Sequence, residues 1–501
     1  MTGIETYTSY IPLYAVLVSL FVVPLIILSS RNPNLREFWT VLAAVIKFLL
    51  VLSLVPSVFF QNKYAVIDIL EISPGLSLSL KVDQFGLFFA IVASGLWILT
   101  SVYSIGYMRG LNEHKQTRYF ASFAVCLSAT MGVAFSANLL TFLIFYETLT
   151  IATYPLVIHK ETQEAISAGR KYLAFTLSAG AVLLGAISWL YIRTGNINFT
   201  PGGIYSNLAN FNGVDKIIFI LFLCGVGVKS AIIPLHSWLP TAMIAPTPVS
   251  ALLHAVAVVK SGVFGVVRVI GFVFGPYFMI QTGMNNVVIV VASLTIILAS
   301  LLAFAQNNLK RLLAYSTIGH LSYIVLGAGL LTPSSFTGGI LHLLNHATLK
   351  ITLFFCAGAI YVVHHKENIS DIDGIGKAMP LTMTAFTIGA LGLIGIPPLN
   401  GFISKWVLGY GAVEGGKIIA LAVLLLSGLL NAGYFVPIIY RAFFKSSNEF
   451  GKYKEASLLI LVPLILTALV SVLIGAFPKL MFGLYDVAMS ISNLVLRGVW
   501  R

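Results

Sequence analysis

Long apolar runs recur along the whole chain, separated by short breaks that hold charged residues, glycine or proline. A transmembrane α-helix needs roughly 20 mainly apolar residues to cross about 30 Å of hydrocarbon, and these runs are of that size. The alternating polarity of a membrane β-barrel, in segments of about 10 residues, is absent. The pattern therefore predicts an all-α polytopic membrane protein with about fourteen transmembrane helices.

The predicted helices are bounded by charged residues or by clusters of glycine and proline. An even number of helices places both ends of the chain on the same side of the membrane. The expected spans are 10–29, 38–60, 83–106, 117–135, 138–158, 168–192, 214–233, 249–272, 285–306, 311–332, 338–363, 380–409, 417–440 and 456–481.

Two of these spans are interrupted by proline close to a lysine. The seventh runs past Lys229 into prolines, and the twelfth has two prolines ahead of Lys405. The predicted helix breaks are Pro234, Pro240, Pro397 and Pro398. Backbone groups freed at membrane depth are tolerated only where protein or water satisfies them. Matching broken helices in two halves of a chain indicate an internal repeat with ion sites at the breaks.

Composition supports the membrane assignment and narrows the function. Of 501 residues, 58% are hydrophobic and 9% charged, with a mean hydropathy of +0.95. Soluble domains carry about 25% charged residues, so a soluble enzyme is excluded. No loop is long enough for a sizeable soluble domain, so any redox or nucleotide chemistry would belong to another polypeptide.

The net charge of +13 does not indicate nucleic-acid binding, because the basic residues are scattered among loops. The positive-inside rule explains them better. Placing the termini outside puts 16 Lys and Arg residues in inner loops and 8 in outer ones. We therefore expect a multi-pass protein of the cytoplasmic membrane with both termini on the outer side. The first apolar run lacks a basic n-region, so it is predicted to be retained.

The three cysteines lie singly within apolar spans, without metal or redox spacing. We therefore expect no metal and no cofactor in this chain. The cysteines are Cys126, Cys224 and Cys356.

Ionisable residues inside the predicted spans are the main candidates for function. Glu147 is the only carboxylate well inside a span. A charge at the bilayer centre costs about 2.5–3.5 kcal/mol on insertion scales, so these residues require a polar interior. The buried bases are Lys229, Lys260, Lys350, Lys405, His254, His320, His342 and His346.

Each candidate also has a structural interpretation. Glu147 could anchor a lysine. His342, His346 and Lys350 recur every four residues and share one helix face, where they could serve interhelical hydrogen bonding. Isolated histidines are often satisfied interior residues, and Lys229 could snorkel. We attribute Lys47 and Arg268 to snorkelling toward an interface.

Lysine, carboxylate and histidine together indicate proton transfer. A buried lysine holds or loses its proton depending on where its charged partner lies. Histidine titrates near neutral pH and relays protons between such groups through water. The set therefore predicts a proton pathway within the membrane.

Five segments carry a family resemblance: FLIFYETLTIATYPLV, VGVKSAIIPLHSWLPTAMIAPTPVSALLHAVAVVKSGVF, LLAYSTIGHLSYIVLG, LHLLNHATLKITLFFCAG and GIPPLNGFISKW. Together they resemble the antiporter-like subunits of respiratory complex I. The resemblance is greatest to the D-type subunit of Mrp sodium/proton antiporters and to its counterparts in membrane-bound hydrogenases. It covers roughly residues 80–440.

The resemblance implies two inverted five-helix repeats, each with a broken helix, in a fourteen-helix fold. The implied segments are 1–116 (about three N-terminal helices), 117–272 (first repeat), 285–440 (second repeat) and 456–501 (C-terminal helix and tail).

The resemblance also implies roles for the buried residues. Glu147 pairs with Lys229, and Lys260 connects the halves. His254, His320, His342, His346 and Lys350 would form the relay. Lys405 would be the terminal charge, and it argues against the complex I subunit type that carries glutamate there.

The implied partners are the lipid bilayer and other integral membrane subunits. If the complex is redox-driven, peripheral subunits would hold nickel–iron or iron–sulfur centres. Nucleic acid is not expected.

Three functions remain open from the sequence. The first is a proton-translocating subunit of an Mrp-type antiporter or of a redox-driven hydrogenase-like or complex I-like machine. The second is a non-pumping structural scaffold, and the third is a standalone secondary transporter. Whether the chain counts as part of an enzyme depends on the complex, since no redox chemistry is expected in the chain itself.

Overall fold

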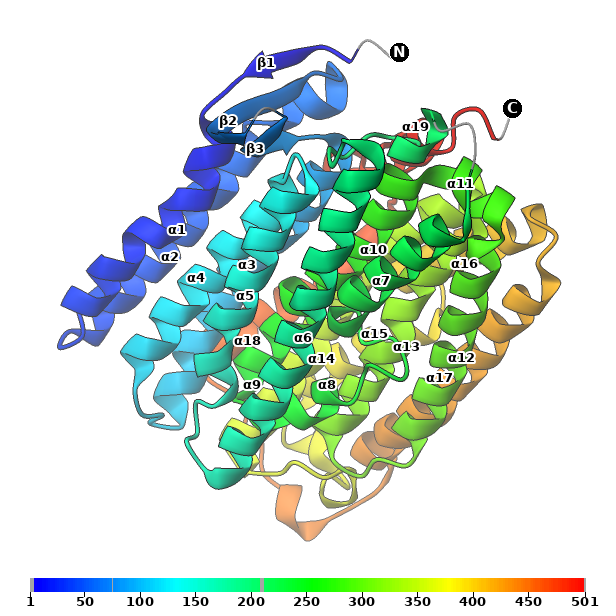
Figure 1. Ribbon diagram of the computed structural model, residues 1–501. Helices are drawn as coiled ribbons and strands as arrows, with labels where there is room; N and C mark the ends of the chain where they lie inside the picture. Colours follow the sequence, from blue (N-terminus) through cyan, green and yellow to red (C-terminus); the bar gives the residue numbers. More distant parts are fainter. Residues whose placement is uncertain (1–3, 74, 208–210, 500–501) are drawn as a thin grey trace.

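The computed structural model describes residues 4–73, 75–207 and 211–499. The outermost residues of the predicted end segments, 1–3 and 500–501, lie outside the described residues. Long helices run side by side in one bundle, and both ends of the chain lie at the same end of it (Figure 1). Within the described ranges, twelve helices are long and apolar enough to cross a membrane. The prediction of an all-α polytopic membrane protein is confirmed.

The first half of the bundle is built by ten helices of very different length. They are α1 (Ile11–Leu28), α2 (Pro33–Leu52), α3 (Gln84–Gly110), α4 (Gln116–Phe135), α5 (Leu139–Val157), α6 (Gln163–Thr194), α7 (Gly213–Lys229), α8 (Trp238–Thr241), α9 (Thr247–Ala251) and α10 (Val258–Arg268).

The second half is built by nine more. They are α11 (Gly275–Thr282), α12 (Met284–Phe304), α13 (Leu309–Leu330), α14 (Pro333–His364), α15 (Pro380–Ile394), α16 (Asn400–Glu414), α17 (Ile418–Phe444), α18 (Leu458–Ala476) and α19 (Leu480–Val495).

The seventh and twelfth predicted spans are the interrupted ones. α7 stops at Lys229 and helix resumes briefly as α8, while α15 stops at Ile394 and α16 begins at Asn400. The eighth span has an irregularity that the sequence did not predict: a π-helical turn, Leu252–Val256, separates α9 from α10. Such turns are rare and occur frequently at functional sites.

A small sheet at the end of the bundle near both termini was not predicted (Figure 1). Its strands are β1 (Thr6–Thr8), β2 (Tyr64–Ser73) and β3 (Leu76–Val82), in the order β1-β2-β3. β1 pairs parallel with β2, and β2 pairs antiparallel with β3. β3 leads directly into α3, so the sheet lies outside the spans.

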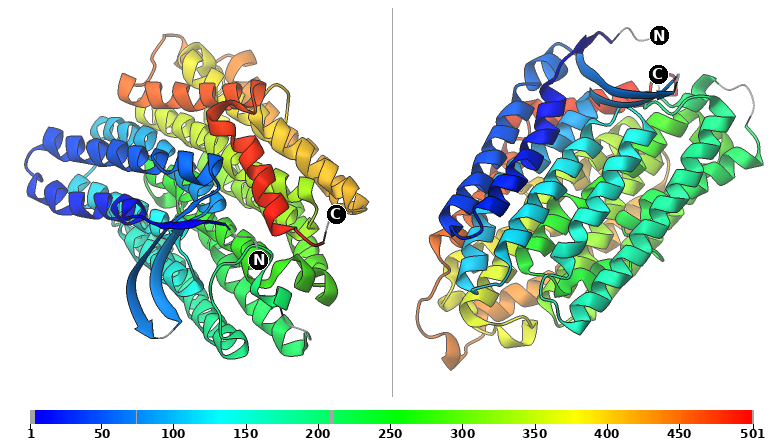
Figure 2. Two further views of the ribbon diagram at one scale, coloured as in Figure 1. Left: turned by 90° about the horizontal axis from the view of Figure 1, so that it is seen from above. Right: turned by 60° about the vertical axis from the view of Figure 1, so that its left-hand side comes forward.

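The predicted C-terminal tail contains a further helix, α19, which lies across the same end of the bundle (Figure 2, left). Ser490 Oγ donates a hydrogen bond to Gln84 Oε1 at 3.0 Å. Thr337 Oγ1 donates to Ser492 Oγ at 2.8 Å. These contacts place α19 over the beginnings of α3 and α14.

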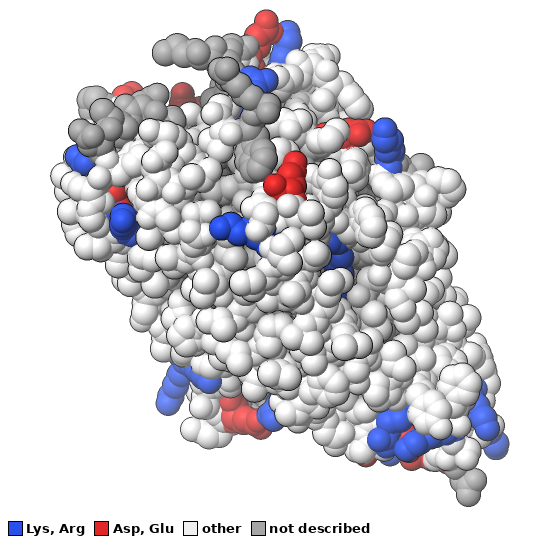
Figure 3. Space-filling model, turned by 90° about the vertical axis from the view of Figure 1, so that its right-hand side faces the viewer, with Lys and Arg blue, Asp and Glu red and all other residues white. Residues whose placement is uncertain are grey.

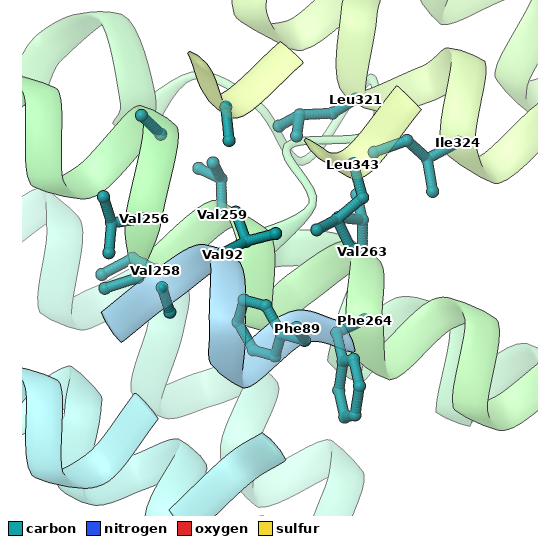
Figure 4. Packing of buried hydrophobic residues seen from close by; sticks show 14 of the residues in the cluster. Phe89, Val92, Val256, Val258, Val259, Val263, Phe264, Leu321, Ile324 and Leu343 are labelled. Carbon is teal, nitrogen blue, oxygen red and sulfur yellow. The ribbon is translucent and has the colours of Figure 1, made fainter. Parts of the chain in front are cut away.

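The core lies where α3, α10, α13 and α14 cross. Val92 of α3, Val259 of α10, Leu321 of α13 and Leu343 of α14 belong to the buried cluster there (Figure 4). In the most apolar 18-residue stretch of α13, 94% of the residues are buried. The corresponding stretch of α17 is 33% buried, so α17 presents an apolar face outward. On the face shown in Figure 3, charged side chains lie toward the two ends, with a broad uncharged band between them. The candidate residues therefore lie inside a bundle whose outer belt suits lipid.

Candidate functional site

The end of α7 at Lys229 is packed inside the protein. Trp238 Nε1 donates a hydrogen bond to Val228 O at 2.8 Å, and Ser230 Oγ donates to Val226 O at 3.0 Å. Both bonds add a side-chain donor to carbonyls in the last turn of the helix, which also accept backbone hydrogen bonds from Ser230 N at 3.2 Å and Ala231 N at 3.0 Å. Gly262 of α10 fits tightly against this turn, since a Cβ there would collide with the backbone nitrogen of Ser230.

Pro234 and Pro240, the predicted breaking prolines of this segment, both follow the packed turn. Pro234 lies in the non-helical stretch between α7 and α8, five residues after the helix ends. Pro240 lies within α8.

Glu147 and Lys229 lie together as an ion pair. Lys229 Nζ is 3.8 Å from Glu147 Oε1, and the lysine side chain is fully buried while that of the glutamate is 22% exposed. Lys229 Nζ donates a hydrogen bond to the carbonyl of Tyr146 and lies 3.4 Å from the centre of that ring. Neither carboxylate oxygen of Glu147 has a hydrogen-bond partner in the described part of the chain. The carboxylate is thus oriented by charge rather than fixed by hydrogen bonds.

Lys260 lies against the polar stripe of α14. Its Nζ is 2.9 Å from His346 Nδ1 and donates to Leu343 O, also at 2.9 Å. A lysine and an imidazole at this distance can form a hydrogen bond, in which the ring nitrogen accepts and the amine donates. The π-helical turn lies immediately before α10 and ends four residues before Lys260.

The histidines of α13 and α14 form one group. His320 Nδ1 is 3.1 Å from His342 Nε2, and the rings of His320 and His346 are centred 5.6 Å apart. His342 Nδ1 is 2.9 Å from Ser404 Oγ of α16, and His320 Nε2 is 3.2 Å from Asn431 Nδ2 of α17. The group therefore extends from α10 to the residue directly before Lys405.

Lys405 lies at the second helix break. Its Nζ donates to Leu393 O at 2.6 Å and to Ile394 O at 3.0 Å. These are the last carbonyls of α15, at the negative end of that helix dipole. Pro397 and Pro398 lie in the turn between α15 and α16. Lys405 also lines a cleft of about 390 Å³ between α16 and α17.

Two predicted residues are buried but lie outside this group. Lys350 Nζ donates to Leu313 O at 3.2 Å and lies 5.7 Å from the centre of the Phe435 ring. His254 packs on the ring of Phe354, and neither of its ring nitrogens has a hydrogen-bond partner among the described residues.

The snorkelling interpretation of Lys47 and Arg268 is wrong. Lys47 is fully buried, and its Nζ donates to Ser19 Oγ at 2.5 Å. Arg268 is also buried and makes two hydrogen bonds to the Asp83 carboxylate, at 2.5 and 2.7 Å. Asp83 is the N-cap of α3 and was therefore predicted to lie at the end of a span. In the structure it is buried beside α10, where its carboxylate accepts from Arg268.

Five polar or charged residues stand out among those that contact the predicted ones, and the sequence did not single them out. Four of them, three hydroxyls and an amide, were visible as polar positions in apolar spans, but their neighbours were not. They are Tyr146, Tyr323, Ser404, Asn431 and the capping Asp83.

A second cavity, of about 520 Å³, opens near the other end of the bundle, beside α8. Its lining is mainly polar and includes Lys171, Thr241 and Lys310. Lys171 Nζ donates to Thr241 Oγ1 at 3.2 Å, and Lys310 Nζ donates to Ala245 O at 3.2 Å. The segment between α7 and α9 therefore forms part of the wall of a polar cavity.

The fold and the buried charges define a class: a polytopic membrane protein whose interior carries linked lysine and histidine side chains. The family comparison agrees with it. Residues 136–431 match the model described as NADH:quinone oxidoreductase/Mrp antiporter, TM, and residues 72–120 match that of the N-terminus of complex I chain 5. The chain belongs to the NADH:quinone oxidoreductase/Mrp antiporter family.

Two curated relatives are similar over most of the chain. NADH-quinone oxidoreductase subunit N of Desulforudis audaxviator is 33% identical over 385 residues, which cover 76% of each protein. Na⁺/H⁺ antiporter subunit A1 of Staphylococcus haemolyticus is 31% identical over 475 residues, 88% of this chain and 58% of that relative. The chain thus spans little more than half the length of subunit A1.

Two solved structures share the fold over nearly the whole chain. A chain of the membrane-bound sulfane sulfur reductase, an archaeal respiratory membrane complex, superposes with a TM-score of 0.88 and 25% identity, covering 97% of this chain and 99% of that one. A chain of the Mrp complex from Dietzia sp. DQ12-45-1b superposes with a TM-score of 0.86 and 22% identity, covering 97% of each. The family prediction is confirmed, while the narrower resemblance to the D-type Mrp subunit stays a prediction.

Proposed function

We propose that this chain is a proton-translocating, antiporter-like subunit of a multisubunit ion-pumping complex. The observation that carries the proposal is the group of buried side chains from Lys260 through His346, His320 and His342 to Ser404. Buried ionisable residues that contact one another across a membrane bundle are expensive to maintain and mark ion pathways. A scaffold would gain the same packing from apolar residues.

The Glu147–Lys229 pair and Lys405 would act at the two sides of this group. Lys229 has a carboxylate partner at 3.8 Å, whereas Lys405 donates to two backbone carbonyls and lies 5.1 Å from the centre of the Tyr323 ring. Carbonyls stabilise an ammonium without accepting its proton. We assign Glu147–Lys229 as the charge pair that responds to voltage or to a partner, Lys260 as the relay, and Lys405 as the terminal group.

Water is the expected carrier between these side chains. Several buried polar atoms in the described part of the chain lack a protein partner, among them both oxygens of Glu147, His346 Nε2, Ser261 Oγ and Ser322 Oγ. Buried polar groups are nearly always hydrogen-bonded, and ordered water serves where protein does not. His254 and Lys350 would join the pathway through such water.

Regular spacing supports the prediction of two five-helix repeats, about 117–272 and 285–440. Asn138 and Asn308 cap α5 and α13 through their side chains, and Thr162 and Thr332 cap α6 and α14 in the same way. Each pair is 170 residues apart. Two isolated antiparallel β-bridges in these halves are related by the same spacing.

The same spacing relates the charges of the two halves. Glu147 corresponds to Thr317, and Gly180 of α6 corresponds to Lys350 of α14. A Cβ on Gly180 would lie 2.6 Å from Glu147 Cδ, so α6 approaches the carboxylate closely. One half thus carries an acid on its second helix and the other a base on its third. Because the acid and the base lie in different halves, this arrangement favours proton transfer from one half to the other rather than a separate proton site in each half.

The two cavities are the proposed routes to the pathway. The polar cavity beside α8 would admit protons toward the break after Lys229. The cleft at Lys405 opens between α16 and α17, toward lipid or a neighbouring subunit. With both termini outside, as basic loop residues favour, the polar cavity faces the cytoplasm.

The partners proposed for the chain follow its relatives. It would lie beside other integral subunits of an Mrp-type antiporter, or of a redox-driven machine of the type represented by the membrane-bound sulfane sulfur reductase. In the second case nickel–iron or iron–sulfur centres would belong to peripheral partners. Within the Mrp type, the D-type subunit is the counterpart proposed.

The test is Lys229→Ala in the intact complex, with Lys417→Ala as the matched control. Lys417 is partly exposed at the start of α17, and its Nζ donates to Asn286 Oδ1. We expect ion transport by reconstituted complex to be lost in the first variant and kept in the second, with equal assembly on native gels. Wild-type transport in Lys229→Ala would instead support a scaffold. Solute uptake by the chain expressed alone would support a standalone transporter.

A further inference from the structure

A cluster of metal-ligating side chains lies at the ends of α3 and α5, well apart from the histidine group of α13 and α14. The turn after α3 supplies Glu113 and His114, and the turn after α5 supplies His159. One ligand atom from each of the three lies within 4.8 Å of the others. These turns lie at the end of the bundle opposite to both termini (Figure 1).

His159 points to a ligand because it is buried without a partner. The side chain is fully buried, and neither ring nitrogen has a hydrogen-bond partner in the described part of the chain. Its Nε2 is 3.8 Å from Glu113 Oε2, and its ring is stacked on that of His114 at 5.0 Å.

We propose that Glu113, His114 and His159 bind one divalent transition-metal ion of the zinc class. Two imidazoles and a carboxylate are a ligand set that suits Zn²⁺, with a fourth position open to water. Ligand atoms around tetrahedral Zn²⁺ lie about 3.3 Å apart, so closing the site requires movements of about 1.5 Å or less. His114 is on the exposed side and in a turn, where such movement costs little.

The surrounding charges leave Glu113 as the acid of the site. Glu161 lies 3.9 Å from His114 Nε2, but it is already bound by Lys115 at 2.7 Å and by Arg118 at 2.5 Å. The Glu113 carboxylate makes long contacts, of 3.8 and 3.9 Å, to the two histidines. These contacts are too long for hydrogen bonds, and a bound cation would replace them.

Ion binding would link two turns that are distant in the sequence, one after α3 and one after α5. α5 carries Glu147 and ends at Val157, two residues before His159. A bound ion would therefore tie the C-terminal end of α5 to that of α3. Sequence spacing did not indicate the site, because its ligands come from two turns about 45 residues apart.

The test uses the intact complex, purified through a tag without histidine and freed of metal by chelation. Zn²⁺ affinity is measured by competition with a chromophoric chelator, and Co²⁺ is used as a spectroscopic probe. We expect one Zn²⁺ per chain and visible Co²⁺ absorption bands from low-symmetry coordination. Glu113→Gln and His114→Ala should each weaken Zn²⁺ binding at least tenfold and reduce those bands.

Both substitutions lie in the turn after α3, where the side chain of His114 is 45% exposed and that of Glu113 is 14% exposed. A melting curve verifies that each variant folds. The matched control is His365→Asn, which removes an imidazole from another turn. Asn is chosen because His365 has a φ of 55°, which asparagine tolerates. Unchanged Zn²⁺ affinity in both variants, or the absence of any Zn²⁺ binding to wild type, would overturn the proposal. A loss of Zn²⁺ affinity in His365→Asn as large as in the two variants would also overturn it.

Discussion

The length of the side chain at position 147 should set the rate of proton transfer in graded steps. Lys229 Nζ and Glu147 Oε1 are 3.8 Å apart. At an effective dielectric of 20, two unit charges at that separation attract by about 4.4 kcal/mol. Glu147→Asp withdraws the carboxylate by about 1.5 Å, one carbon–carbon bond. At about 5.3 Å the attraction falls to about 3.1 kcal/mol.

This difference of about 1.3 kcal/mol corresponds to about tenfold in rate if the pair controls the transfer step. Glu147→Gln keeps the shape but removes the charge and the whole attraction. Its rate should fall by about a thousandfold or more, below detection in a flux assay. The expected order is therefore wild type, then Asp, then Gln, with clear steps between them.

The assay is proton flux into liposomes that contain the purified complex, followed with a pH-sensitive dye. A sodium gradient or the native electron donor drives transport, whichever the complex uses. Glu71→Gln is the matched control, because Glu71 is an exposed acid on β2, outside the spans. Native gels measure assembly separately. If Glu147→Gln transports at the wild-type rate in assembled complex, the ion pair has no role in translocation.

Three further outcomes follow from single contacts. Trp238→Phe should lower the melting temperature in detergent, because it removes the buried hydrogen bond from Trp238 Nε1 to Val228 O, which contributes about 1 kcal/mol. Ser404→Ala should slow proton flux about fivefold at unchanged assembly, since it removes a hydrogen bond of about 1 kcal/mol from the histidine group; equal flux would show that this contact is not on the path. Asp83→Asn should impair folding by about 3–5 kcal/mol, because Arg268 is left as an uncompensated buried charge, and a second change of Arg268 to Met should restore expression.

Hydropathy predicted the bundle because lipid imposes one solution on the backbone. Every peptide group in hydrocarbon must be bonded within its own helix, so apolar length alone locates the spans. The broken helices at Lys229 and Lys405 were also visible, since proline and lysine are both unusual at that depth. These features depend on local sequence and the bilayer, not on which helices are neighbours.

Features that depend on neighbours were not predictable from one sequence. Arg268 was interpreted as a snorkelling residue because its partner, Asp83, lies 185 residues away. The sheet escaped notice because its strands lie outside the apolar spans: β1 precedes α1, and β2 and β3 lie between α2 and α3. Ser404 was visible only as a hydroxyl in an apolar helix. Its contact with His342 required the packing of α16 on α14, which hydropathy does not encode.

The contacts of the lysines indicate where control of proton transfer would reside. Lys229, Lys260 and Lys405 all donate to backbone carbonyls, which position an ammonium but cannot take its proton. Direct transfer requires contact with a second titratable side chain, which Glu147 and His346 provide for the first two lysines.

Among the described residues, no hydrogen bond joins the Glu147–Lys229 pair to Lys260, or Ser404 to the amine of Lys405. A proton that crosses either interval must use water or a movement of the lysine. The two intervals lie at the broken helices, whose last turns are held by a few side-chain hydrogen bonds rather than by continuing helix. A third interval lies within the histidine group, where the rings of His346 and His320 are centred 5.6 Å apart and His346 Nε2 has no hydrogen-bond partner in the described part of the chain. The arrangement of donors and acceptors therefore favours gating at these three intervals, two of which lie at the helix breaks.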